Sequence, residues 1–355
     1  MKVVKNIFKT LLAIILILLV LVAGLLVWLT IVEYKPQDTE PVTVQALNAK
    51  TKTLSTGDSI KLVAWNMGYA ALGDNADFFM DGGKMVYTAD EARVRENLNA
   101  IISEVKSQDA DIVLFQEIDI NSDRSYHINE PNYFDNLGYS NRAFANNFKV
   151  EYAPFPIPPM GKIDSGIATY SKYKTTSAAR VQLPCPFSWP IRTFNLKRCL
   201  LITRIPVEGG KELVIVNLHL EAYDDGEGKA AQAQMLMDVF REETAKGNYV
   251  IAGGDFNQSF SNVKVDYPVF AEQWQPASMD VSPFENECRF LMDPKVASCR
   301  SLYTPLAGHD PASLQYYVID GFIISKNIQM DSYEIKDLGF KNSDHNPQIL
   351  KVTLK

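Results

Sequence analysis

A long uncharged apolar segment near the N-terminus restricts the possible folds of this 355-residue sequence more than any other feature. Leu11–Val32 contains no charged residue and is about as long as a helix that crosses a lipid bilayer. A cleaved signal peptide would have a shorter apolar region that ends at a small-x-small cleavage site, and this run ends without one. A buried core helix of this kind would be unusual at the extreme N-terminus. We therefore expect an uncleaved transmembrane anchor at 11–32, preceded by a basic segment at 1–10.

The charges on either side of the apolar run predict its orientation. Lysine-rich flanks of membrane spans stay in the cytoplasm, so the more positive side of the run should be the inner side. The flanking charged residues are Lys2, Lys5 and Lys9 before the run and Glu33, Lys35, Asp38 and Glu40 after it. We expect a single-pass protein of the cell membrane with a cytoplasmic N-terminus and the rest of the chain outside.

A linker and one large domain are expected after the anchor. Residues 33–56 are polar, include Pro36 and Pro41, and show neither helical nor strand periodicity, which is typical of a linker. Residues 57–355 contain neither internal repeats nor low-complexity tracts. The net charge of −7 argues against a protein that coats nucleic acid nonspecifically, although it is compatible with a local basic groove.

Apolar runs of strand length dominate this domain. The segment Ser59–Asn66 is typical of a buried strand, whereas residues 90–108 and about 229–245 have helical periodicity. Further strands are predicted at 111–118, 166–171, 199–205, 212–220, 249–256, 318–325 and 348–354. Many strands with few helices between them predict an α+β fold or a layered α/β sandwich, in which two packed sheets are flanked by helices.

Polar residues lie at or near the ends of these predicted strands. A single Asp, Asn or His in such a place is usually a turn former or a satisfied hydrogen-bonding residue. Several together indicate a site, because strand ends are where sheets display functional side chains. Carboxylate and amide oxygens suit Mg²⁺ or Mn²⁺, and the sequence has no Cys/His cluster or HExxH helix that would favour zinc. The strand-end residues are Asn66, Glu117, His219, Asp255, Asn257, Asp320, Asp344 and His345.

The order of the motifs around these residues resembles that of the endonuclease/exonuclease/phosphatase superfamily, here in a membrane-anchored, bacterial-type form. The resemblance covers residues 57–355 and extends to the deoxyribonuclease- and sphingomyelinase-like members. It implies a four-layer αββα sandwich, that is, two packed mixed β-sheets flanked by helices. The motifs are WNMG at 65–68, FQEID at 115–119, SGIATYSK at 165–172, NLHLEA at 217–222, GGDFN at 253–257, VIDGFIIS at 318–325 and SDHNP at 343–347.

The resemblance also implies a metal site. Glu117 would bind Mg²⁺ or Mn²⁺ directly, with Asn66 beside it. Asp344 would either contact the metal as well or contact the residues that bind it. An in-line displacement at phosphorus accumulates negative charge, which a metal and fixed donors must stabilise.

Catalytic roles are implied for five further residues of the motifs. Asp255 would position and activate the attacking water, and Asn257 would hold the phosphate. His345 would act at the scissile phosphate as acid, base or charge stabiliser, with Asp320 as the Asp that orients it. His219 would contact the phosphoryl oxygens from the other side.

Two further stretches are ambiguous. Residues 121–127 could bring Arg124, Tyr126 or His127 to the phosphate, which a guanidinium recognises well, or could form a solvated loop. Residues 187–199 interleave aromatic and basic side chains; they could stack a base or touch a headgroup, but a cover over the core is favoured.

The four cysteines permit two disulfides if the domain lies outside the membrane. Their spacing matches no CxxC zinc pattern, and free buried thiols are as compatible with the sequence as bridges. If the cysteines are oxidised, we expect Cys288 to pair with Cys299, because the loop between them is short, and Cys185 to pair with Cys199.

The sequence therefore predicts a monomeric, Mg²⁺-dependent phosphoester hydrolase, most simply a phosphodiesterase, that acts outside the membrane on a small or lipid-borne phosphoester. A surface nuclease for DNA or RNA is the alternative, and an inactive ectodomain that only binds a partner is a third reading. An inositol polyphosphate phosphatase is disfavoured, because VIDGFII stands where a PxWxDRIL-type segment would be expected. Duplex DNA is disfavoured by the acidic charge of the domain.

Overall fold

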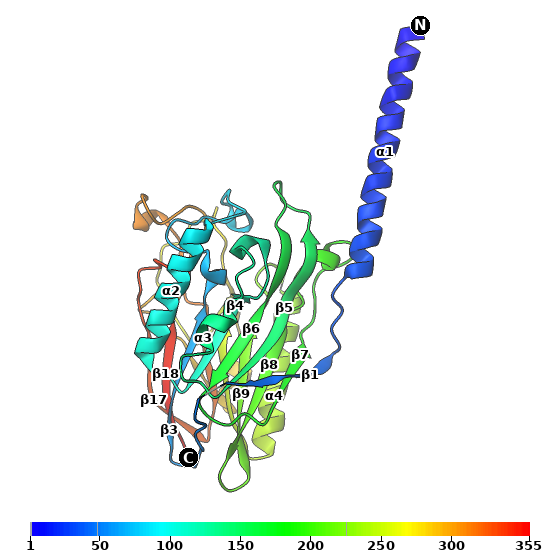
Figure 1. Cartoon of the computed structure of the whole chain (residues 1–355). Helices are drawn as coiled ribbons and strands as arrows, with labels where there is room; N and C mark the ends of the chain where they lie inside the picture. Colours follow the sequence, from blue (N-terminus) through cyan, green and yellow to red (C-terminus); the bar gives the residue numbers. More distant parts are fainter. Residues whose placement is uncertain (1, 48, 225) are drawn as a thin grey trace.

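Two seven-stranded sheets pack face to face in the computed structural model, which describes residues 2–47, 49–224 and 226–355 (Figure 1). The first sheet has the order β1 (Thr39–Val42), β7 (Ser177–Gln182), β8 (Cys199–Val207), β9 (Lys211–His219), β10 (Tyr249–Asp255), β16 (Asp320–Ser325) and β13 (Cys288–Leu291). The second has the order β17 (Ile328–Ile335), β18 (Gln348–Leu354), β3 (Ser59–Asn66), β4 (Ile112–Asp119), β6 (Gly161–Ser171), β5 (Asn141–Ala153) and β2 (Val44–Ala46). Two short pairs complete the strands: β11 (Gln258–Phe260) with β12 (Ala277–Met279), and β14 (Cys299–Arg300) with β15 (Tyr316–Tyr317).

Apolar side chains on both faces of the central strands produce the layers of the fold. Because successive side chains of a strand point to opposite faces, Leu62 of β3 enters the core between the sheets, whereas Val63 packs on the outer face. The core between the sheets joins Leu62 and Leu114 of one sheet to Ile215 and Ile251 of the other, and all are fully buried. Each outer face carries its own buried cluster beneath a helix. The predicted four-layer αββα sandwich is confirmed.

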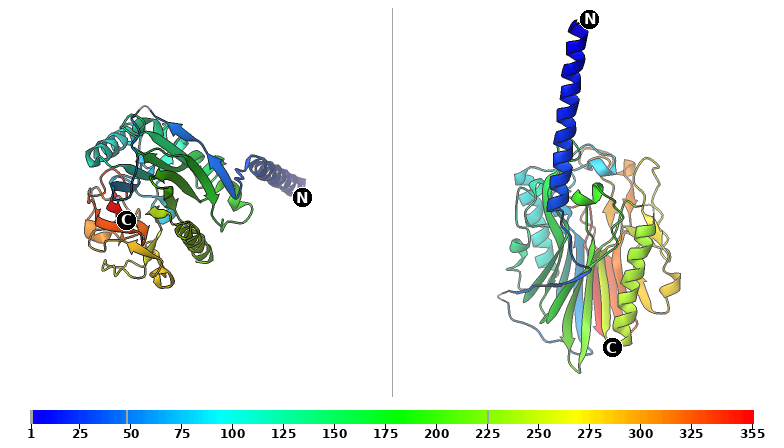
Figure 2. Two further views of the ribbon diagram at one scale, coloured as in Figure 1. Left: turned by 90° about the horizontal axis from the view of Figure 1, so that it is seen from below. Right: turned by 90° about the vertical axis from the view of Figure 1, so that its right-hand side faces the viewer.

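The two long helices of the folded domain, α2 and α4, cover opposite outer faces of the sandwich (Figure 2). Helix α2 (Glu91–Gln108) begins after Asp90, whose carboxylate accepts a hydrogen bond from Arg93 N at 2.8 Å and so caps the first turn. Its apolar side chains recur at helical spacing and are buried against the outer face of the β3/β4 sheet. Helix α4 (Glu227–Ala245) buries Leu236, Met237 and Phe240 against the β9/β10 sheet in the same way.

The strand directions bring the polar strand ends together. β3 and β4 run parallel to each other, as do β9 and β10, so Asn66, Glu117, His219 and Asp255 all lie at one end of the sandwich. β16 runs antiparallel to β10 and begins at this same end with Asp320, which pairs with Asp255. The C-terminus lies at the opposite end (Figure 1). The sandwich therefore has one end that carries the predicted site.

The segment predicted as a linker is partly strand. Thr39–Val42 forms β1 against β7, and Val44–Ala46 forms β2 against β5, so part of 33–56 belongs to the folded domain. Pro41 had indicated a break, but β1 is an edge strand, where the missing N–H of a proline is tolerated. Both strands are too short for their periodicity to show in the sequence.

The N-terminal helix α1 (Lys2–Val32) projects from the domain and is long and apolar enough to cross a membrane (Figure 1). Most of its side chains are exposed, but Leu29 near its C-terminal end is buried against the domain. A membrane-spanning helix predicted from the apolar run is therefore compatible with the structure.

All four cysteines are free thiols, so the predicted disulfides are absent from the structure. Cys288 packs in the apolar cluster beneath α4, whereas Cys299 lies in a separate cluster beside His345. Proximity in the sequence misled the prediction, because β13 and β14 belong to different sheets.

Candidate active site

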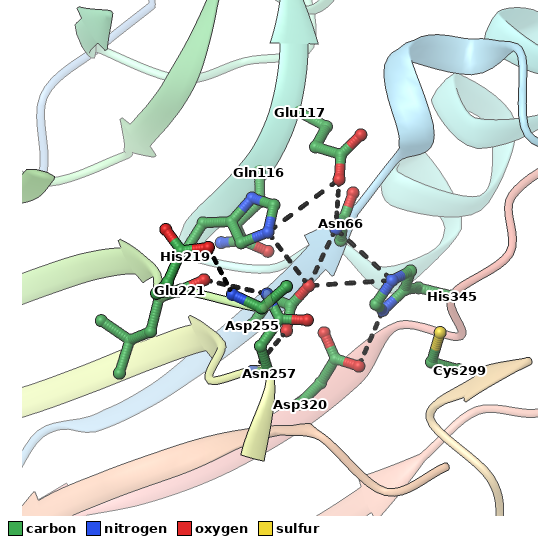
Figure 3. Close-up of polar contacts among 12 residues, drawn as sticks. Asn66, Gln116, Glu117, His219, Glu221, Asp255, Asn257, Cys299, Asp320 and His345 are labelled. Carbon is green, nitrogen blue, oxygen red and sulfur yellow. Dashed lines mark hydrogen bonds and ion pairs between the residues drawn. The ribbon is translucent and has the colours of Figure 1, made fainter. Parts of the chain in front are cut away.

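Asn66 connects the carboxylates at the centre of the site (Figure 3). Its amide nitrogen donates to Glu117 Oε1 at 3.1 Å and to Asp255 Oδ2 at 3.0 Å, and lies 3.4 Å from His345 Nε2. Its amide oxygen accepts from the backbone N–H of Gly68 at 3.0 Å, which fixes the orientation of the amide group. Asn66 thus joins side chains from both sheets.

A bulge in β4 presents Glu117 to the site. The pairing of β4 with β6 shifts register between Phe115 and Ile118, so an extra residue of β4 is left unpaired. Glu117 has a φ of 50°, in the left-handed region that few non-glycine residues adopt. Backbone strain of this kind is stored at functional sites.

Gln116, beside Glu117 in the bulge, lies beneath the site and links the two sheets. Its amide nitrogen donates to Asn217 Oδ1 at 2.7 Å, and Asn217 Nδ2 donates to Phe115 O and Ala168 O of the other sheet. The sequence analysis quoted both residues within motifs but assigned them no role. Polar residues in the interior of strands predicted to be buried are the signal that could have identified them.

His345 forms a buried pair with Asp320 and faces Asp255. Its Nδ1 lies 2.8 Å from Asp320 Oδ2, and its Nε2 lies 3.7 Å from Asp255 Oδ2. His219 approaches the same oxygen of Asp255 from the other side, with its Nε2 at 3.4 Å (Figure 3). Asp255 therefore lies between two imidazoles, one of which is held by a second carboxylate.

Backbone geometry also orients Asp255 and Asn257. The N–H of Asn257 donates to Asp255 Oδ1 at 2.8 Å, in a turn in which Asn257 has a φ of 51°. Asn257 Nδ2 donates to Leu220 O at 2.9 Å. The amide group of Asn257 is thereby fixed at the wall of the pocket, where the sequence analysis expected a phosphate contact.

The surroundings of the two histidines shift their pKa values in opposite directions. Burial opposes the charged form of His345, but the Asp320 carboxylate outweighs it and raises the pKa of His345 well above its usual range. Burial lowers the pKa of His219, and the Arg198 guanidinium lowers it further. At neutral pH, His345 therefore carries a positive charge and His219 is neutral.

Two carboxyl groups of the site have raised pKa values. Burial raises the pKa of Asp255 to about 7, with the Asp320 carboxylate adding to the effect and His345 opposing it. Burial likewise raises the pKa of Asp344 to about 7. Strongly shifted groups converging in a cleft are typical of a functional site.

The donor atoms of the site fit a hard divalent cation. The site gathers carboxylate oxygens, and Asp344 Oδ1 is buried with no hydrogen-bond partner among the described residues. The amide oxygen of Asn66, which the sequence resemblance placed beside the metal, instead accepts from the N–H of Gly68. Asp344, His345 and Cys299 can direct ligand atoms to one point, as can Asp255, Asp320 and His345. Glu117 and Asp344 both border the pocket, and the Glu117 carboxylate adds to the rise in the pKa of Asp344, a repulsion that a cation bound between them would relieve. Oxygen-rich sites of this kind suit Mg²⁺ or Mn²⁺.

The site opens into a pocket of about 260 Å³ whose walls are mainly apolar. Glu117, His219, Asp255, Asp344 and His345 lie along one part of it. The apolar part is formed by Leu72, Phe78, Phe79, Met80, Phe148, Phe155, Phe194, Trp274 and Leu302. Glu117, His219, Asp255, Asp344 and His345 were predicted from the sequence as site residues, whereas Asp81, Asn147, Asn195, Arg198 and Arg300, which also line the pocket, and almost all of its apolar residues were not.

The two residues predicted to bind substrate from 121–127 have different positions. Arg124 lies in the pocket wall, but its guanidinium is engaged with Asp119 through hydrogen bonds of 3.1 and 3.0 Å and stacks on the Tyr69 ring at 3.6 Å. Tyr126 does not line the pocket, and its hydroxyl donates to Ala89 O at 2.9 Å. The structure therefore does not place Tyr126 where the sequence analysis expected it.

Known families and structures show the same fold. A model of the Endonuclease/Exonuclease/phosphatase family matches residues 63–268, more than half of the chain. An endonuclease/exonuclease/phosphatase protein of Beutenbergia cavernae is similar in structure, with a TM-score of 0.56, 16% identity, and 83% of this chain and 72% of that chain covered. The catalytic domain of human Nocturnin has a TM-score of 0.52 at 16% identity, with 88% and 98% of the two chains covered.

An endonuclease/exonuclease/phosphatase protein of Bacteroides vulgatus has a TM-score of 0.51 at 13% identity, over 84% of this chain and 100% of that chain. None of the curated proteins matches this sequence. The family match ends at residue 268, so Asp320, Asp344 and His345 lie beyond it and are brought to the site by β16 and the segment before β18.

Proposed function

Because the chain belongs to the Endonuclease/Exonuclease/phosphatase family, we propose that it is a divalent-metal-dependent phosphoester hydrolase, anchored in the cell membrane by α1 and acting outside it. The observation that carries the proposal is the buried Asp320–His345 pair directed at Asp255, beside Glu117 and Asn66. These groups can activate a water, stabilise a phosphate and hold a cation within one pocket. Residues 57–355 with β1 and β2 would form the catalytic domain.

Different side chains of the site would carry out different parts of the proposed reaction. Asp255, with a pKa near neutrality, would accept a proton from the attacking water, while the N–H of Asn257 keeps its carboxylate in place. His345, charged and held by Asp320, would stabilise the phosphoryl oxygens and protonate the leaving group. Neutral His219 and Asn257 would contact the phosphate from the other side. Bound at Glu117 and Asp344, the cation would supply Lewis-acid stabilisation of charge at phosphorus. Asn66, whose amide oxygen accepts from Gly68 N–H, would orient the Glu117 carboxylate through its amide nitrogen.

The test is hydrolysis of bis-p-nitrophenyl phosphate by the purified protein. We expect p-nitrophenol to be released with Mg²⁺ or Mn²⁺, and we expect EDTA to abolish this release. Failure to hydrolyse this substrate and a wider panel, with either metal, would favour an inactive ectodomain that binds a partner. The panel comprises supercoiled plasmid, single-stranded RNA, sphingomyelin and phosphatidylinositol. Efficient nicking of plasmid without hydrolysis of phospholipid or small diesters would instead make the protein a surface nuclease.

Replacing Glu117 with Gln should raise the Mg²⁺ concentration needed for half-maximal activity. A neutral amide keeps one oxygen but lacks the charge that holds a hard cation, so activity should partly recover at high Mg²⁺. The matched control is Glu151→Gln, because Glu151 is exposed on β5, forms an ion pair with Lys162 and does not line the pocket. An unchanged Mg²⁺ titration of Glu117→Gln would remove Glu117 from the metal site.

Metal binding should weaken as the pH falls through about 7. The pKa of Asp344 and that of Asp255 are each raised to about 7, and a cation binds the ionised carboxylate, so protons compete with the metal below that pH. Calorimetry of Mn²⁺ binding at about pH 6 and about pH 8, in buffers of different ionisation enthalpy, should show proton release at the lower pH. Asp344→Asn should reduce the pH dependence; equal affinity at both pH values in the parent protein would contradict the assignment.

A further inference from the structure

Helix α1 leaves the domain at the end that carries the active site. The strands β3, β4, β9 and β10 all end there, and the C-terminus lies at the other end (Figures 1 and 2). If α1 spans a membrane, this end of the sandwich faces that membrane. The pocket, which is lined by residues at these strand ends, then lies on the side of the domain nearest the membrane.

Contacts at the end of α1 hold the helix against the domain. Leu29 is 1% exposed, and the carboxylate of Glu33 lies 3.4 Å from both Arg192 Nε and Lys197 Nζ. Trp189 Nε1 donates to Thr30 Oγ1 at 3.1 Å. Because the strands β1 and β2 follow directly, the domain is fixed near α1 and does not swing on a free linker.

These contacts fix the level of the loop at 189–191 relative to the apolar run of α1. Thr30 lies inside the apolar run that ends at Val32, so Trp189, which is bonded to Thr30, lies at the level of the last turn of the span. Tryptophan is enriched at the boundary between lipid and water, because its ring is apolar and its N–H is polar. Trp189 and Ile191 are nevertheless exposed, at 53% and 44%, as expected if lipid covers them.

The tip of the β5–β6 hairpin exposes two further large apolar side chains. It rises beside α1 at the top of the domain (Figure 1). Phe155 is 65% exposed and Ile157 is 91% exposed, which is unusual for two large apolar side chains so close together. Phe155 also lines the pocket that contains the catalytic residues, so the apolar hairpin tip extends into the pocket wall. A headgroup could reach the catalytic groups while its lipid stays in contact with apolar side chains.

We propose that the hairpin tip at 155–157 and the loop at 189–191 enter the interface of the membrane that α1 spans, and that the substrate is the phosphoester headgroup of a lipid in that membrane. The substrate assignment rests on the proposed hydrolase function, whereas the membrane contact does not. Hydrolysis would form a bond from the water oxygen to phosphorus, break one P–O ester bond and leave a proton on the departing alcohol. The contact and the substrate are therefore tested separately.

Membrane contact is tested with the full chain in liposomes of phosphatidylcholine and phosphatidylglycerol. Cys185 is exposed and is replaced by Ser, whereas the other three cysteines are buried and should resist labelling. A polarity-sensitive fluorophore is then placed on Ile157→Cys or, as a control, on Met330→Cys, because Met330 is 40% exposed on β17 toward the opposite end. The label at 157 should be quenched by nitroxide lipids and the label at 330 should not. Absence of quenching at 157 would overturn the proposed contact.

The substrate is tested with Ile157→Asp in the same liposomes. A carboxylate at the tip should reduce headgroup release from phosphatidylglycerol by roughly tenfold or more, since burying an isoleucine side chain contributes about 1.5–3 kcal/mol. Hydrolysis of soluble bis-p-nitrophenyl phosphate should stay near the parent rate, and Met330→Asp should change neither activity. Equal rates of lipid hydrolysis in both variants, or hydrolysis of the soluble diester without any of the lipid, would overturn the lipid assignment. A parent protein inactive on every substrate would instead contradict the hydrolase function, and the quenching result would stand by itself.

Discussion

Replacing Asp255 with Asn should reduce turnover of bis-p-nitrophenyl phosphate by about three orders of magnitude or more, which is within the range for loss of a general base. The amide cannot accept a proton from water at Asp255 Oδ2. It keeps the shape of the side chain, and its oxygen can still accept from Asn257 N–H, which donates to Asp255 at 2.8 Å. A neutral amide avoids the cost of burying a charge, but its NH2 group would face the Asn66 amide nitrogen that donates to Asp255 Oδ2. These opposed effects should leave the melting temperature little changed.

The control for this variant is Asp331→Asn, since Asp331 is an exposed carboxylate on β17. It should keep the parent activity. A purified Asp255→Asn protein with comparable activity at saturating Mg²⁺ would contradict the assignment of Asp255 as the base.

His345 provides an independent check on the same mechanism. A position at the end of a strand suggests an accessible side chain, but His345 and Asp255 are both buried in the structure. His345→Ala would therefore leave the Asp320 carboxylate buried without its partner and could lower stability as well as activity. In His345→Asn the amide nitrogen can still donate to Asp320 while the charge facing Asp255 is lost, so activity should fall by about 10²-fold or more and stability should change little.

The site could be predicted from the sequence because its residues sit where apolar strands end. Parallel pairing of β3 with β4 and of β9 with β10 was enough to bring such ends to one edge of the sandwich. The bulge at Glu117 and the amide bridge made by Asn66 depend on tertiary pairing, which a strand pattern does not reveal. The polar residues were therefore identified without their contacts.

Short edge strands and loops were the part of the fold that the sequence did not predict. β1 and β2 each have too few residues for alternation to be visible, and they are held by pairing with β7 and β5. The apolar side of the pocket comes from loops and from a hairpin tip, where no periodicity applies. No role was predicted from the sequence for Phe155 and Ile157, because their exposure at a hairpin tip beside α1 is visible only in the structure.

Arg124 lines the pocket as a substrate-binding residue would, but it also has a structural partner that the sequence did not reveal. An arginine after a metal-binding strand favours a phosphate contact, but its guanidinium is committed to Asp119, on the strand that carries Glu117. Asp119 is fully buried, and its backbone N–H donates to the carboxylate of Glu130, which is also fully buried. Burial raises the pKa of Glu130 well above its usual range, and the Asp119 carboxylate raises it further. Arg124 is thus the cation that balances this acidic cluster.

Replacing Arg124 with Met should lower the free energy of unfolding by about 3–5 kcal/mol, because it leaves the Asp119 carboxylate buried without its cation. The matched variant is Arg124→Met with Asp119→Asn, which removes the uncompensated charge and should recover part of the loss. Denaturant unfolding of the full chain in detergent micelles, followed by tryptophan fluorescence, measures both. A loss below about 1 kcal/mol in the single variant, together with a large rise in KM for the diester, would show that Arg124 serves mainly to bind substrate, as its sequence position first indicated.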